Sequence, residues 1–148
     1  MTIPLVSRRA GLCLSTLALS ALAAAGCGKD SNPGSPSPST TAVFSEIQRD
    51  ILTPSCVSCH TNDGRTPAGD LDLRPGVAYG NLFNRPSAQK SGAMLVVAGN
   101  AAGSYLVQKL EGAADIVGVR MPRNGPPYLS DAQVAVIRQW IQDGAMNN

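Results

Sequence analysis

The residues of this sequence that best fit a defined chemistry are two cysteines and a histidine in the run Cys56-Val57-Ser58-Cys59-His60. Two cysteines separated by two residues can each form a thioether bond to one vinyl-derived carbon of a haem. A histidine directly after the second cysteine lies close enough to ligate the iron. The spacing therefore predicts covalent attachment of one c-type haem through Cys56 and Cys59, with His60 as an axial iron ligand.

Zinc binding and thiol-disulfide exchange also use a Cys-x-x-Cys pair. A structural zinc site needs four nitrogen or sulfur ligands, but the chain has 1 histidine and no cysteine after Cys27 other than this pair. A thiol-disulfide centre is expected at the start of a helix in a strand-helix-strand pattern, whereas Thr53-Pro54 precedes the pair here and a polar, Gly-rich stretch follows it. A reactive or disulfide-bonded pair is therefore the weaker alternative.

The second axial ligand must be another residue type, a weak ligand or an empty position, because His60 is the one histidine. A methionine thioether suits iron. Met146 lies past the end of the last predicted helix, where fraying is expected, and Met94 lies in an apolar run where methionine usually fills core space. Met121 lies in a loop rich in Pro and Gly that ends where the last helix begins. We therefore expect Met121 to be the distal ligand, with an ordinary surface or core role as the alternative.

Residues 1–26 have the pattern of a bacterial signal peptide, with two arginines before an apolar stretch that is too short to span a bilayer comfortably. The small residues before Cys27 resemble a lipobox, so we expect Cys27 to be lipidated. Cleavage that leaves a soluble periplasmic protein is the alternative. Gly28 stands where an Asp often retains lipoproteins at the inner membrane, which favours anchoring at the outer membrane.

The lipidated Cys27 begins a tether over residues 27–41, which is rich in Pro and Ser and has almost nothing to pack in a core. Residues 42–148 have the length of one domain. The chain has 12 basic and 10 acidic residues, and loss of Arg8 and Arg9 with the signal peptide makes the two kinds equal. This balance gives no reason to expect nucleic acid as a partner.

A first helix is predicted before Cys56, beginning at an N-cap provided by Thr41 and ending at Pro54. A turn or short helix is predicted between Pro75 and Phe83. Another short helix carries Tyr105 to Leu110 and ends at Gly112, with Asn100 or Ser104 as its cap. The residues at three- and four-residue spacing that share one face of the first helix are Val43, Phe44, Ile47 and Ile51.

The last helix is the most strongly specified element. Ser130 and Gln133 match a capping box, and Leu129 and Val134 match a hydrophobic staple. Gly144 is the predicted stop. Apolar residues around much of the circumference predict burial on more than one side, namely Ala132, Val134, Val136, Ile137, Trp140 and Ile141.

These features resemble monohaem class I cytochromes c over the whole of residues 42–148. The resemblance rests on the haem-binding run near the start of the domain, on Met121 in a later loop and on the closing amphipathic helix. A longer segment over residues 61–120 departs from the family. Three stretches resemble a bacterial subgroup first noted in planctomycetes: Gly69-Asp70-Leu71-Asp72-Leu73-Arg74, Ser104-Tyr105-Leu106-Val107-Gln108-Lys109-Leu110 and Arg120-Met121-Pro122.

The resemblance implies an all-α, cytochrome c-like fold in which the N- and C-terminal helices cross around one covalently bound haem, with loops between them. This crossing would bring Phe44 or Ile47 against Trp140 or Ile137. The resemblance also implies proximal and distal iron ligands, which are His60 and Met121.

An iron with both axial positions filled has no open site for a substrate, so we expect a single-electron carrier and not an enzyme. We expect a monomeric domain, tethered to the membrane in the bacterial periplasm, that exchanges electrons with unidentified redox proteins. One alternative is a haem enzyme or a sensor of peroxide or small gases, in which Met121 is displaced. Another is a haem-bearing module of a larger redox complex. Three arginines either pair with haem propionates or with a redox partner, or are solvated surface charges. They are Arg74, Arg120 and Arg123.

Overall fold

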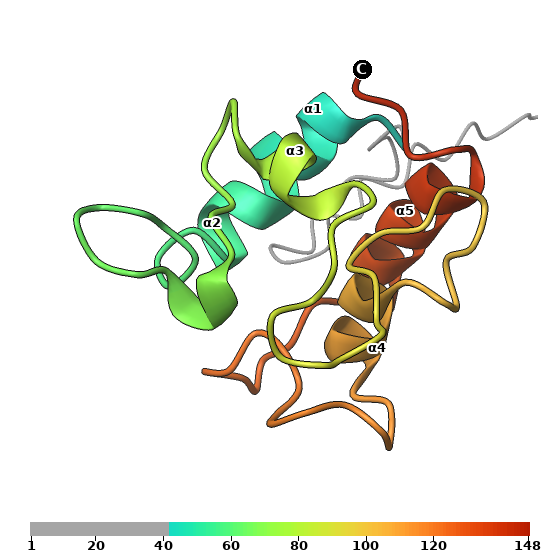
Figure 1. Ribbon diagram of the computed structural model, residues 1–148. Helices are drawn as coiled ribbons and strands as arrows, with labels where there is room; N and C mark the ends of the chain where they lie inside the picture. Colours follow the sequence, from blue (N-terminus) through green and yellow to red (C-terminus); the bar gives the residue numbers. More distant parts are fainter. Residues whose placement is uncertain (1–41) are drawn as a thin grey trace, which may run out of the picture. The chain divides into compact units, whose positions relative to one another are not determined.

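The computed structural model describes residues 42–148, which form helices joined by long loops (Figure 1). The predicted signal peptide, the lipidated Cys27, the tether and the Thr41 cap lie outside these residues. Within residues 42–148 there is no strand, and the backbone pairs only at two isolated bridges, Phe83 with Val96 and Pro86 with Met94. No helix in this range is long and apolar enough to cross a membrane. The all-α class is therefore confirmed for the described part of the chain.

The first helical segment delivers the chain to Cys56. Its continuation past Pro54 shows that the predicted stop at this proline is wrong. The segment has three contiguous pieces, which are α1 Phe44–Ile47, a π-helical turn Gln48–Leu52 and α2 Thr53–Ser55.

Pro54 is tolerated because the hydrogen-bond ladder changes register beside it. The N–H of Thr53 donates to the carbonyl of Gln48, as in a π-helix. The N–H of Cys56 donates to the carbonyl of Leu52 at 2.9 Å, which is the α-helical register. Pro54 has no N–H to donate, and it lies between the residue that follows the π-helical register and the residue that follows the α-helical one. The helix therefore lacks one backbone hydrogen bond at Pro54 but continues past it.

The start of α1 is capped from the other end of the sequence. Val43 occupies the N-cap position and provides no side-chain hydrogen bond. Instead, Phe44 N–H donates to the side-chain Oδ1 of Asn148 at 3.0 Å, and Ser45 N–H donates to the backbone carbonyl of Asn148 at 2.8 Å. Asn148 therefore satisfies two of the N–H groups that a helix start leaves without an intrahelical partner.

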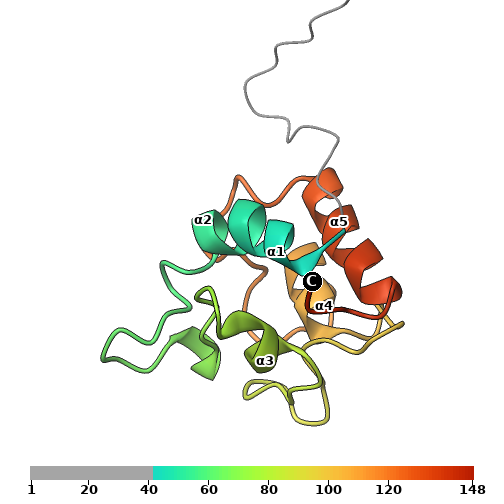
Figure 2. The same cartoon turned by 90° about the horizontal axis from the view of Figure 1, so that it is seen from above.

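The last helix, α5 Asp131–Gln142, contacts α1 (Figure 2). Its capping box is confirmed, because Gln133 N–H donates to Ser130 Oγ at 3.3 Å and Ser130 N–H donates to Gln133 Oε1 at 3.0 Å. Burial on more than one side is wrong: Ala132 is exposed and Val136 only half-buried. The buried residues lie on one stripe and are Val134, Ile137, Trp140 and Ile141.

Aromatic rings fix the contact between the first and last helices. The ring centres of Phe44 and Trp140 lie 5.2 Å apart, which confirms this pair among the contacts expected. Tyr79 adds a third ring, 5.3 Å from Phe44 in an edge-to-face arrangement. It comes from α3 Ala78–Leu82, a helix that lies inside the predicted stretch between Pro75 and Phe83.

The remaining helix, α4 Tyr105–Glu111, contacts α5 and carries the loop that follows it. Ser104 occupies its N-cap position but does not cap it, because the Ser104 hydroxyl donates to the Asn100 carbonyl at 2.8 Å and accepts from Val97 N–H at 2.9 Å. Gly112 ends the helix as predicted. Its φ of +72° is left-handed, a conformation that favours glycine.

Candidate functional site

The haem-binding run begins where α2 ends. Cys56 is half-buried and Cys59 is exposed, and both are free thiols. The N–H groups of Cys59 and His60 donate to the Cys56 carbonyl at 3.1 and 3.0 Å, so one tight turn holds all three residues. Burial, with a smaller contribution from Cys59, raises the pKa of the Cys56 thiol to about 11. The structure thus gathers two unpaired thiols and an imidazole, as the spacing predicts.

His60 is suited to bind a metal as a neutral imidazole. Burial lowers its pKa, backbone groups of Leu71 and Ala68 act in the opposite direction, and the positive charge of Lys109 adds a small lowering. The neutral ring is the form that ligates metals. Its Nδ1 is buried and has no hydrogen-bond partner among the described residues.

The segment after His60 is folded back onto the first helical segment. Ala68 N–H donates to the Cys59 carbonyl at 3.1 Å, and Leu73 N–H donates to the His60 carbonyl at 2.9 Å. Gln48, which is buried in the π-helical turn, donates from Nε2 to the Leu73 carbonyl at 3.0 Å. The backbone around His60 is therefore anchored through Leu73 to the helix that precedes it.

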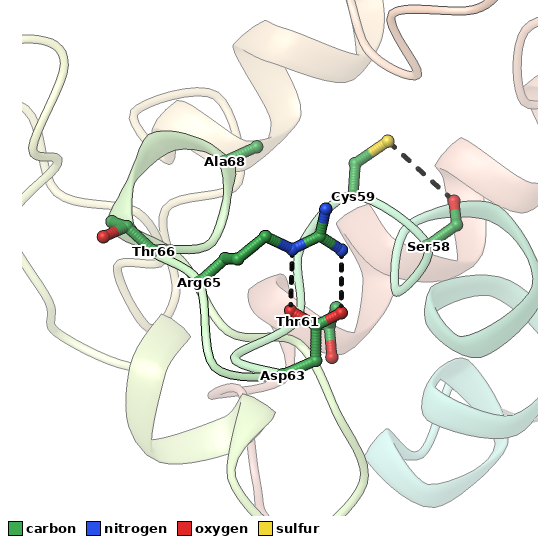
Figure 3. A pocket seen from close by; sticks show the side chains of 7 residues that line it. All are labelled: Ser58, Cys59, Thr61, Asp63, Arg65, Thr66 and Ala68. Atoms are coloured by element: carbon green, nitrogen blue, oxygen red, sulfur yellow. Dashed lines mark hydrogen bonds and ion pairs between the residues drawn. The ribbon is translucent and has the colours of Figure 1, made fainter.

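A small cavity of about 300 Å³ lies beside Cys59 (Figure 3). Its wall includes an ion pair in which Arg65 donates to Asp63 at 2.9 Å, and Cys56, His60 and Met121 do not line it. A porphyrin face needs apolar surroundings, so this polar hollow does not match the expected haem cavity. The residues that line it are Ser58, Cys59, Thr61, Asp63, Arg65, Thr66 and Ala68.

The structure distinguishes the three methionines of residues 42–148. Met121 is half-buried and packs against the hydrophobic core. Met94 is half-buried but does not belong to the side chains packed on that core, so its predicted role as core filler is not confirmed. Met146 is 62 % exposed beyond the end of α5. Met121 is thus the methionine with the partly apolar surroundings that a distal ligand needs.

Met121 is held against the end of α4. Its N–H donates to the Lys109 carbonyl at 2.8 Å, and Arg120 Nε donates to the Leu110 carbonyl at 2.7 Å. The ammonium of the same Lys109 exerts its charge on His60. The end of α4 therefore interacts both with the loop that carries Met121, the expected distal ligand, and, through the charge of Lys109, with His60, the expected proximal ligand.

The three arginines considered for haem propionates differ in their partners. Arg74 pairs with Asp72, with 2.6 Å between Nη2 and Oδ2. Arg120, besides its bond to α4, lies 4.3 Å from the ring centre of Tyr128. Arg123 is exposed and makes no ion pair or hydrogen bond with the described residues. Of the three, Arg123 is the one without a partner in residues 42–148.

Two buried polar residues, Gln48 and Lys109, support the site and were not predicted from the sequence. Each gives a detectable signal. Gln48 interrupts the apolar stripe of the first helix four residues after Phe44, and Lys109 follows Tyr105 at the same spacing. A polar side chain on an apolar face indicates a buried hydrogen-bonding role.

Comparison of the chain with models of protein families, with curated proteins and with solved structures gave no match in any of the three. Among residues 42–148, no three His, Cys, Asp or Glu side chains gather as a metal-binding group would. An iron site built from one imidazole and one thioether, with the metal held in a porphyrin, does not require such a group. The assignment of the site therefore rests on its own residues.

Proposed function

We propose that the protein is a single-electron carrier with one c-type haem. In this proposal Cys56 and Cys59 hold the haem through thioether bonds, His60 is the proximal iron ligand and Met121 is the distal one. The observation that carries the proposal is the turn in which two free thiols adjoin a half-buried imidazole. The core-packed position of Met121 supports the second ligand.

The residues present fit the chemistry of this group. When bound, the haem supplies an iron that gains and loses one electron. Burial favours the neutral ring of His60, which is the form that ligates metals, and its buried Nδ1 has no hydrogen-bond partner among the described residues. The thioether of Met121 is a soft ligand, and a His and Met pair raises the reduction potential relative to harder ligand pairs. Both axial positions would be filled, which favours electron transfer over binding of a substrate.

We further propose that the carrier works in the bacterial periplasm as a monomer, tethered through a lipid on Cys27 to the membrane, with Gly28 favouring the outer membrane over the inner one. Haem c is attached outside the cytoplasm, which agrees with the signal peptide pattern of residues 1–26. The partners proposed are other redox proteins. Because residues 27–148 carry equal numbers of basic and acidic side chains, the proposal includes no nucleic acid.

The test is a haem stain and an absorption spectrum of the mature protein. We expect haem that survives denaturation in the wild type and is lost in the double variant Cys56→Ala, Cys59→Ala. The reduced wild type should have a low-spin spectrum that carbon monoxide does not readily change. Absence of covalent haem would refute the proposal as a whole. A native spectrum that carbon monoxide changes at once would instead favour the enzyme or sensor with a displaceable Met121.

A further inference from the structure

Lys109 is a buried cation whose partners are backbone carbonyls of a single loop. It is 8 % exposed in the last turn of α4, and no carboxylate among the described residues pairs with it. Its Nζ donates to the carbonyl of Val117 at 2.9 Å and to the carbonyl of Val119 at 2.6 Å. A buried ammonium is costly unless hydrogen bonds compensate for its lost hydration. This loop provides that compensation, so the position of the loop and the burial of Lys109 depend on each other.

Tyr105, one turn earlier on the same face of α4, holds the same stretch of loop. It is 2 % exposed, and its hydroxyl oxygen accepts a hydrogen bond from Val117 N–H at 2.9 Å. The N–H of Val117 is therefore bound by Tyr105 and its carbonyl by Lys109. Residues four apart on a helix lie side by side, which allows the two side chains to act on one residue of the loop.

Lys109 also binds the end of the loop through its own backbone. The last carbonyls of a helix lack intrahelical partners. In α4 the Lys109 carbonyl accepts from Met121 N–H at 2.8 Å. One residue thus holds the loop at Val117 and Val119 with its side chain and at Met121 with its main chain.

Apolar packing contributes little to the position of the loop between Val117 and Val119, before the core-packed Met121. The side chains of Val117 and Val119 are 46 % and 53 % exposed, so they bury little surface. With such side chains, the hydrogen bonds to α4 are the main interactions available to keep the backbone in place.

We propose that Lys109 is a positioning residue for the distal iron ligand, fixing the loop through Val117 and Val119 so that Met121 stays within reach of the iron. This inference rests on the proposed function, in which Met121 ligates the iron. A loop that is already ordered loses less conformational freedom when the sulfur binds. Lys109 therefore favours the state with Met121 bound over the state with the distal position open.

The test uses the mature holoprotein and the variant Lys109→Met, which keeps a long side chain and removes the donors. Two measurements report on the ligand: the weak charge-transfer absorption of a thioether bound to ferric iron, and the rate at which carbon monoxide binds to the reduced protein. We expect the absorption to weaken and the binding to become about tenfold to a hundredfold faster, because hydrogen bonds to a charged group are lost. A purely structural role would shift unfolding without opening the iron.

The matched control is Lys90→Met. Lys90 pairs with Asp115 at 2.6 Å and lies 5.3 Å from the ring centre of Tyr105, so it contacts the beginning of the same loop but not Met121. We expect the control to keep the absorption and the slow binding of the wild type. A change as large as that of Lys109→Met would mean general loosening of the loop and would overturn the proposal.

Tyr105→Phe covers the case in which Lys109→Met does not fold. It keeps the buried ring and removes the acceptor for Val117 N–H, so a smaller change in the same direction is expected. The proposal is refuted if Lys109→Met folds and keeps the iron–thioether absorption and the slow binding of carbon monoxide. If Lys109→Met does not fold, the same result for Tyr105→Phe refutes it. A wild type that contains haem but lacks this absorption would refute both the role of Lys109 and the assignment of Met121, whereas a change confined to the variants supports both.

Discussion

The rings of Phe44 and Trp140 lie 5.2 Å apart and join the first helix of the domain to the last. Two rings of this aromatic cluster also form hydrogen bonds to the segment after α5. Trp140 Nε1 donates to the Met146 carbonyl at 2.8 Å, and the hydroxyl of Tyr79 donates to the Ala145 carbonyl at 3.0 Å. The segment after α5 is thus bound to the same aromatic cluster that packs against α1.

Phe44→Ala should lower the free energy of unfolding by about 3–5 kcal/mol, because it removes a buried ring at the contact between two helices. Urea denaturation followed by far-ultraviolet circular dichroism measures this loss. The control is Phe83→Ala, which removes a half-buried ring that stacks on Tyr79 at 5.3 Å. The control should lose clearly less stability, and equal losses would contradict the central role of Phe44.

Asn148→Ala should destabilise the protein by about 1 kcal/mol, in the range of other helix caps. The variant removes the Oδ1 acceptor for Phe44 N–H and keeps the backbone carbonyl that binds Ser45. The same denaturation experiment checks it. Asn147→Ala is the matched control, since Asn147 is an exposed neighbour. If the two variants are equally stable, Asn148 does not act as a cap.

The sequence predicted the elements whose signals are local. The capping box of Ser130 and Gln133 and the stop at Gly112 need only neighbouring residues, and both are present. The cap of α1 comes instead from Asn148, a contact at a sequence separation of 104 that no local pattern reveals. The predicted stop at Pro54 failed for another reason: a π-helical turn shifted the hydrogen-bond register beside the proline.

The same distinction holds for the candidate site. The grouping of the cysteine pair with His60 follows from their adjacency in the sequence, whereas the haem that this spacing predicts stays a prediction. The support of Met121 by α4 depends on Lys109, whose spacing from Tyr105 indicates burial but does not identify the groups that it binds. Those groups are carbonyls of the loop after α4, which has no regular periodicity from which to predict its fold.

Met121→Ala should open the distal position of the iron. The reduced variant should bind carbon monoxide rapidly, because no thioether competes with it, and should lose the absorption of the iron–sulfur bond. Stopped-flow spectroscopy measures the rate. Met146→Ala is the control, since Met146 is 62 % exposed and lies outside the core. If the Met146 variant opened the iron while the Met121 variant did not, the ligand would have been wrongly assigned.

The two thiols should differ in reactivity before haem is attached. Thiolate is the reactive form, and a pKa raised to about 11 leaves Cys56 almost entirely protonated at pH 8. Cys59 is also the more exposed of the two. In a haem-free chain lacking residues 1–27, iodoacetamide at pH 8 should therefore modify Cys59 first, as peptide mass spectrometry would show. Raising the pH toward 11 should narrow the difference, and urea should abolish it. Equal rates at pH 8 without urea would contradict the burial of Cys56.

Cys27→Ser should release the protein from the membrane, because the hydroxyl of serine cannot take the place of the lipidated thiol. The wild type should partition into detergent and accumulate as a precursor when globomycin inhibits the lipoprotein signal peptidase. The variant should instead appear in the soluble periplasmic fraction with its haem spectrum unchanged, since all the proposed haem-binding residues belong to residues 42–148. Cys13→Ser, a cysteine within the predicted signal peptide, is the matched control and should remain on the membrane. Unchanged membrane association of the Cys27 variant would refute the anchor and leave the haem site untouched, because the two claims depend on different cysteines.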